Sequence, residues 1–67
     1  MTVSKNLYTL RKTYGLSLQY LSEQTGITPA SLSAYEKGKY LPSLENICRL
    51  ADFYQVSLEE LIRGNIC

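Results

Sequence analysis

Signals that begin and end helices recur along this chain, and they constrain its fold more than any other feature. A serine or threonine of the kind that caps a helix precedes four of five apolar helical patterns, and a glycine follows four of the five. No stretch alternates apolar and polar residues convincingly, as a half-buried strand would. The chain is therefore expected to be all-α, with five short helices. The N-cap residues are Ser17, Thr28, Ser43 and Ser57, and the helix-ending glycines are Gly15, Gly26, Gly38 and Gly64.

Apolar residues at helical spacing mark the faces expected to form the core. Ser57 and Glu60 have the spacing of a capping box at the start of the last helix. Helices of about 6 to 12 residues joined by short turns predict a compact bundle. The first helix presents Val3, Leu7, Leu10 and Tyr14, and the fourth presents Leu44, Ile47, Leu50, Ala51 and Tyr54. Pairs with hydrophobic-staple spacing are Leu16 with Leu21, Ile27 with Leu32, and Val56 with Leu61.

The turn Thr25-Gly26-Ile27-Thr28 joins the second and third helices and is too short for comfortable antiparallel packing. Two helices that cross steeply around a glycine-containing turn form a helix-turn-helix. Gly26 supplies a positive φ there without steric cost. We predict one domain over residues 1–67 with a central helix-turn-helix at about residues 17–38.

Length and composition exclude several classes of protein. A chain of 67 residues with 45% apolar and 19% charged residues is one globular domain of marginal stability. No apolar run approaches the roughly 20 residues of a membrane span, and MTVSKNLYTL does not resemble a signal peptide. There is no histidine, which removes most metal sites and the usual general base. We therefore expect no enzyme activity, cofactor, metal, membrane or small-molecule site.

Cys48 and Cys67 lack the spacing of a metal site or redox pair. Cys48 falls within a helical apolar pattern and is interpreted as a small core residue, whereas Cys67 ends the chain. This cysteine usage fits a reducing compartment, so the expected location is the cytoplasm.

Residues 18–37, LQYLSEQTGITPASLSAYEK, resemble the helix-turn-helix signature of the Cro and phage-repressor (Xre-like) class. That signature has apolar, small and glycine positions, which are filled here by Leu21, Ser22, Gly26, Ile27, Leu32 and Tyr35. The segments LRKTYGLS, YEKGKYLPSLENICRLADFY and VSLEELI extend the resemblance over nearly the whole chain. It implies a lambda-repressor-like five-helix bundle. It also implies an ion pair between Arg11 and Glu36 that ties the first helix to the end of the third.

In this family the third helix enters the major groove of double-stranded DNA, and its first residues meet base edges. The resemblance assigns that role to Thr28, Pro29, Ala30, Ser31, Ser33 and Ala34. Pro29 and Ala34 depart from the long polar side chains that are common there, and they offer only apolar contact, for instance to thymine methyl groups. Leu18 replaces a glutamine that commonly contacts phosphate, so Gln19 becomes the candidate. Each of these residues also has a purely structural interpretation as a cap or a helix former.

The net charge of +1 hides an uneven distribution. Residues 1–39 carry a net charge of +3 and residues 40–67 a net charge of −2. Lys37 and Lys39 flank Gly38 and are candidate phosphate contacts, whereas Lys5 and Lys12 can equally be ordinary solvated lysines.

One such domain covers half of a palindromic site, so a homodimer is expected. Leu58, Ile62 and Ile66 share a helical spacing and are the candidate dimer contacts, although Leu58 and Ile62 can instead complete the monomer core. The leading hypothesis is a small transcriptional repressor or controller that binds an operator. The alternative is a helix-turn-helix that serves as a protein-interaction module with weak or no DNA binding. It is favoured by the near-neutral charge and by Leu18, Pro29 and Ala34.

Overall fold

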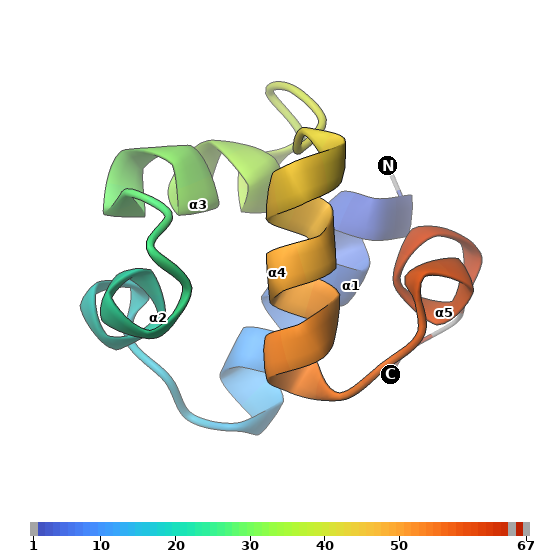
Figure 1. Ribbon diagram of the computed structural model, residues 1–67, viewed down its shortest axis with the longest axis horizontal. Coiled ribbons are helices and arrows are strands. Elements are labelled where there is room, and N and C mark those ends of the chain that lie inside the picture. Colours follow the sequence, from blue (N-terminus) through green and yellow to red (C-terminus); the bar gives the residue numbers. More distant parts are fainter. Residues whose placement is uncertain (1, 65, 67) are drawn as a thin grey trace.

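The computed structural model describes residues 2–64 and residue 66. Five helices make up this part of the chain: α1 (Thr2–Thr13), α2 (Leu18–Thr25), α3 (Pro29–Lys37), α4 (Leu44–Tyr54) and α5 (Leu58–Arg63). In Figure 1, α4 crosses the middle of the molecule in front of α1, with α2 and α3 on one side and α5 on the other. The expected five-helix bundle is confirmed.

The predicted helix starts are confirmed, because each N-cap side chain accepts a hydrogen bond from a backbone N–H three residues further on. The bonds run from Tyr20 to Ser17, from Ser31 to Thr28, from Asn46 to Ser43 and from Glu60 to Ser57. In the last pair the Glu60 carboxylate also accepts from the Ser57 N–H at 3.0 Å, which completes the capping box. Local hydrogen bonds thus fix the residues at which these four helices begin.

The core lies between α1, α4 and the helix-turn-helix. Leu50 and Leu61 are completely buried, and Asn6 is the polar residue that joins α5 to this core. Its amide donates to the Leu61 carbonyl at 3.0 Å and the Gly64 carbonyl at 2.8 Å. The core cluster contains Val3, Leu7, Leu10, Leu21, Ile27, Leu32, Tyr35, Ile47, Leu50, Ala51, Tyr54 and Leu61.

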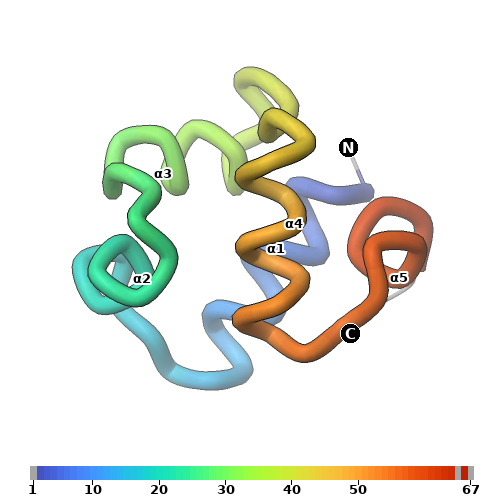
Figure 2. The backbone as a smooth tube through the Cα atoms, in the orientation of Figure 1, coloured from blue at the N-terminus to red at the C-terminus, as the bar shows by residue number. Residues whose placement is uncertain are grey.

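Two side chains are more exposed than the sequence predicted, and two helix ends have backbone conformations that it did not specify. Tyr14 is 55% exposed because α1 ends at Thr13, and its ring stacks on Tyr54 with centroids 5.8 Å apart. Leu44 is 73% exposed because α4 begins beside the loop at residues 38–43, at an edge of the molecule (Figure 2). Gly64 ends α5 with φ −68°, outside the left-handed region, and the left-handed residue that ends α4 is Gln55, with φ 59°. These positions depend on how helices meet rather than on local pattern.

Cys48 is half-buried in α4 and carries a free thiol. It packs outside the main core cluster. Cys67, the other cysteine considered from the sequence, lies outside the described residues.

Candidate nucleic-acid interface

The turn between α2 and α3 holds the two helices at a fixed crossing. Gly26 adopts φ 76°, and its N–H donates to the Ser22 carbonyl at 2.8 Å. Thr25 Oγ1 donates to the Leu21 carbonyl at 2.8 Å and accepts from the Ile27 N–H at 3.3 Å. Ile27 then enters the core at 3% exposure. These hydrogen bonds engage the Gly26 and Ile27 N–H groups of the turn, and the start of α3 that follows lies at the surface.

The first turn of α3 presents short side chains, some polar and some apolar. Thr28, Pro29 and Ala30 are exposed, and Ser31 and Ser33 are half-buried. The Thr28 hydroxyl accepts from the Ser31 N–H at 3.2 Å and donates to Ser31 Oγ at 3.0 Å, so its own proton is engaged. The Ser31 hydroxyl accepts that bond and can still donate outward. Of the two hydroxyls, Ser31 is the better placed to donate to a base or phosphate.

Ala34 does not lie on this surface, and the expectation that it is exposed was wrong. It is 8% exposed. The chain reverses after α3 at Gly38, which has φ 75°, and the Lys39 N–H donates to the Ala34 carbonyl at 3.0 Å. Leu32 and Tyr35 of the same helix are also buried, so Ala34 belongs to the inward part of α3 and not to its exposed first turn.

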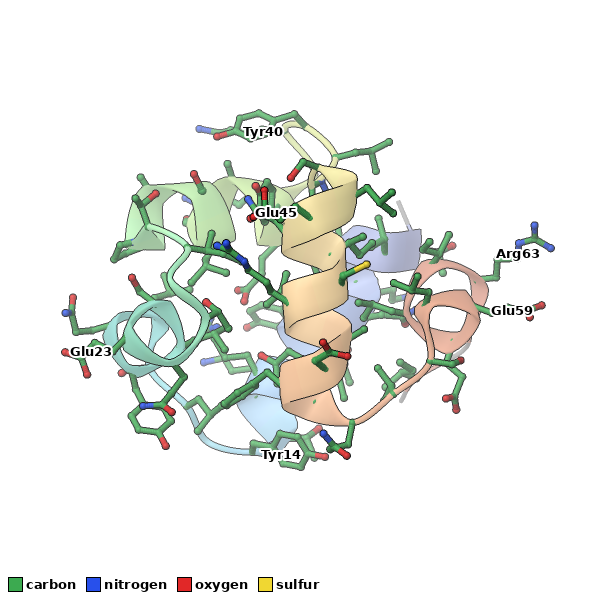
Figure 3. The ribbon with its side chains drawn as sticks, viewed as in Figure 1. Tyr14, Glu23, Tyr40, Glu45, Glu59 and Arg63 are labelled. Carbon is green, nitrogen blue, oxygen red and sulfur yellow. The ribbon has the colours of Figure 1, made fainter. Side chains whose placement is uncertain are left out.

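Polar side chains flank α3 on two sides. Lys37 and Lys39 are exposed where α3 ends, as expected of phosphate contacts. Gln19 is exposed on α2, but its amide donates to the Glu23 carboxylate at 3.2 Å, and Glu23 points outward from α2 in Figure 3. Leu18 packs partly against the core, which explains an apolar residue at that position. The basic groups thus gather at the end of α3 rather than at the start of α2.

Arg11 and Glu36 form the expected ion pair between α1 and α3. Arg11 Nε and Nη2 donate to the two carboxylate oxygens of Glu36 at 2.8 and 2.9 Å, and Nη1 donates to the Leu16 carbonyl at 2.9 Å. The side chains are only 13% and 7% exposed. The hydrogen bond to Glu36 raises the pKa of Arg11, against a smaller opposing effect of burial. One side chain therefore connects the end of α1, the loop before α2 and the end of α3.

A second surface lies around α5, away from α3. Leu58 and Ile62 are 37% and 44% exposed, whereas Ile66 packs partly against the core. Leu41 and Leu44, which the sequence did not single out for this surface, are more exposed at 61% and 73%. An apolar groove of about 290 Å³, hereafter the α4–α5 groove, is lined by Val3, Leu41, Pro42, Leu44, Ile47 and Ile62. The apolar pair Leu41 and Leu44 on either side of Pro42 was the available sequence signal.

The described residues contain no group of three or more histidine, cysteine, aspartate or glutamate side chains that is arranged to hold a metal ion. Among the described helices, none has both the length and the apolar composition needed to cross a membrane.

Comparison with known sequences places residues 7–61 within the helix-turn-helix family model. Over 61 residues the chain is 31% identical to the cryptic phage CTXphi transcriptional repressor RstR of Vibrio cholerae, covering 91% of this chain and 54% of RstR. Over 53 residues it is 40% identical to the transcriptional regulator AnsR of Bacillus subtilis, covering 79% of this chain and 46% of AnsR. The chain therefore spans about half the length of these curated relatives.

Two solved structures share the fold. The P22 c2 repressor, crystallised with a synthetic operator, superposes with a TM-score of 0.89 at 22% identity, over 97% of this chain and 98% of the repressor. A transcriptional regulator from Listeria innocua superposes with a TM-score of 0.83 at 28% identity, over 97% of this chain and 60% of the regulator. The arrangement of all five helices is thus that of a phage-repressor domain.

Proposed function

The chain belongs to the Xre-type helix-turn-helix family, and from this membership we propose that it is a sequence-specific transcriptional regulator that binds double-stranded DNA. The observation that carries the proposal is the exposed start of α3, which follows a turn fixed by hydrogen bonds of Thr25, Gly26 and Ile27. The relative RstR is itself named as a transcriptional repressor, and the P22 c2 repressor structure contains an operator.

In this proposal α3 enters the major groove with its first turn against the bases. Pro29 and Ala30 offer apolar contact to thymine methyl groups, and the Ser31 hydroxyl donates to a base or phosphate oxygen. Ser33 lies one helical turn after Pro29 and therefore on the same face of α3. Lys37 and Lys39 contact the phosphates that border the groove. The side chains are short, so the backbone of α3 must approach the bases closely.

A homodimer on a palindromic operator is the second part of the proposal. One domain reads a half-site, and the α4–α5 groove together with Leu58 offers an apolar surface away from α3. Glu59 and Arg63 flank Ile62 on α5. In a twofold arrangement of α5 helices, Glu59 of one copy can face Arg63 of the other. Ile66 is left out of this surface because it packs against its own core.

Selection of bound duplexes from a random DNA pool tests the proposal. We expect an enriched sequence with two related half-sites, bound at least a thousandfold more tightly than random DNA, as is typical of specific regulators. Sedimentation of the free and bound protein gives the number of copies. Ile62→Asp is expected to yield a folded monomer with weaker operator binding, and a dimer that persists in this variant would contradict the proposed surface.

A charge variant identifies the reading helix. Ser33→Glu places a negative charge against the DNA and is expected to abolish binding without unfolding the domain. Gln55→Glu, which adds the same charge at the far end of α4, is the matched control and should bind nearly normally. If the two variants bind DNA with equal affinity, α3 is not the helix that contacts the bases. No binding of any duplex by the unmodified protein at micromolar concentration would favour the protein-interaction alternative.

A further inference from the structure

A polar groove runs between the start of α1 and the end of α3, outside the surface described so far. It has a volume of about 560 Å³, and its lining includes Ser4, Lys5, Tyr8, Glu36, Lys37 and Gly38. The two helices that form it pack directly against each other, and α1 reaches this side of the molecule behind α4 (Figure 1). The groove therefore begins where the proposed reading helix ends.

The groove is positively charged although an acidic residue lines it. Both carboxylate oxygens of Glu36 accept hydrogen bonds from Arg11, so that charge is already compensated. The ammonium groups of Lys5 and Lys37 come from opposite helices. Lys12 adds a further cation near the Tyr8 ring, with its ammonium 5.7 Å from the ring centroid. An anion in the groove meets cationic side chains from both helices.

Ser4 provides an independent indication of a ligand. The residue is 5% exposed, and its hydroxyl oxygen has no hydrogen-bond partner within the described part of the chain. A buried hydroxyl without a partner is unfavourable, because it loses water and gains nothing in return. Rotation about its single side-chain bond can turn the hydroxyl towards an oxygen bound in the groove. The wall of the groove thus contains an unsatisfied donor beside two lysines.

We propose that this groove binds one phosphate of the DNA backbone, so that α1 joins α3 in holding the duplex; the inference rests on the proposed function. The nine residues of α3 span roughly 13 Å, close to the roughly 12 Å width of the major groove. When the start of α3 meets base edges, its end lies near the sugar-phosphate strand that borders the groove. Lys5, which the sequence left as an ordinary solvated lysine, becomes a phosphate contact.

The salt dependence of binding measures this contact. Fluorescence anisotropy with the selected duplex and with random duplex, at several salt concentrations, gives the slope of log affinity against log salt for each variant. Lys5→Gln is expected to lower the magnitude of that slope by about 1, or about eightfold in affinity near 0.1 M salt, equally on both duplexes. Arg49→Gln is the matched control, because Arg49 lies on α4 outside the groove and pairs with Glu45 at 2.7 Å, and it should leave the slope unchanged.

Two further measurements separate a phosphate contact from a structural effect. Ser4→Ala removes the unsatisfied hydroxyl, so we expect unchanged or higher thermal stability together with weaker binding of both duplexes. Replacing single phosphates of the duplex by neutral methylphosphonates should identify one position that weakens the unmodified protein but not Lys5→Gln. If the unmodified protein binds DNA while Lys5→Gln keeps the full slope, this inference is overturned and the proposed function stands. If the unmodified protein binds no DNA, the proposed function itself fails.

Discussion

Replacing Arg11 by methionine tests the buried ion pair that connects α1 with both helices of the helix-turn-helix. The change removes two hydrogen bonds to Glu36 and one to the Leu16 carbonyl, and it leaves a carboxylate that is only 7% exposed without its partner. Removing one member of a buried pair typically costs about 3–5 kcal/mol. A domain of 67 residues has a total stability of roughly 3–10 kcal/mol, so Arg11→Met is expected to lose about half of it or more.

Urea denaturation followed by circular dichroism at pH 7 measures the loss. The double variant Arg11→Met/Glu36→Leu removes the stranded charge as well, and we expect it to recover most of the lost free energy of unfolding. The coupling between the two positions then follows from the double-mutant cycle. A cost below about 1 kcal/mol for Arg11→Met would mean that the pair behaves like a solvated surface contact and would refute the reasoning.

The chain contains its own control in the pair between Arg49 and Glu45. These side chains lie 2.7 Å apart on consecutive turns of α4, but they are 45% and 72% exposed. Solvent screens such a pair, so Arg49→Met is expected to cost only about 0.3–0.5 kcal/mol. The two ion pairs have similar N–O distances. A difference in the stability lost by the two arginine variants therefore reports the effect of burial and not of distance.

Three further predictions concern single residues. Gly26→Val is expected to unfold or strongly destabilise the domain, because a β-branched residue at φ 76° is strained even though the nearest side-chain atom is 3.6 Å away; thermal melts check this. Gln55→Gly is expected to raise stability by up to about 1 kcal/mol in the same assay, since Gln55 adopts φ 59°. Burial raises the pKa of the Tyr54 phenol above its unfolded value of about 10. The neutral phenol therefore contributes its full stability below about pH 10, and this contribution is lost as the pH rises above that value. Tyr54→Phe should therefore lose less stability than the unmodified protein between pH 8 and 11, by up to about 1.4 kcal/mol per pH unit, and parallel pH curves would contradict the assignment.

The helix ends were predictable because their causes are local. An N-cap serine or threonine bonds to a backbone N–H three residues away, and Gly26 and Gly38 meet a backbone requirement that few other residues satisfy. The Arg11–Glu36 pair was reached only through the family resemblance. Its partners lie 25 residues apart, and no local pattern in the chain connects them.

The sequence-based expectations were wrong at positions whose exposure depends on tertiary packing. Ala34 is buried together with Leu32 and Tyr35 on the inward part of α3, and Leu44 is left at the surface where α4 begins. Asn6 stands on the apolar face of α1, between Val3 and Leu10 at helical spacing, and this signal could have identified it as a buried polar residue. Its role depended on where α5 ends, because its amide bonds to carbonyls 55 and 58 residues away.

In the proposed function, the short side chains of α3 limit how the protein discriminates between DNA sequences. A paired hydrogen bond from a long polar side chain contributes about 1–3 kcal/mol of discrimination, and α3 presents none of these at its exposed start. Methyl and hydroxyl contacts discriminate less per base pair, so the deformability of the DNA and a second half-site must supply more of the specificity. A closely approaching α3 depends in turn on firm backbone contacts at both of its ends. This is the physical reason that a phosphate site between α1 and α3 matters more here than in a reader with long polar side chains.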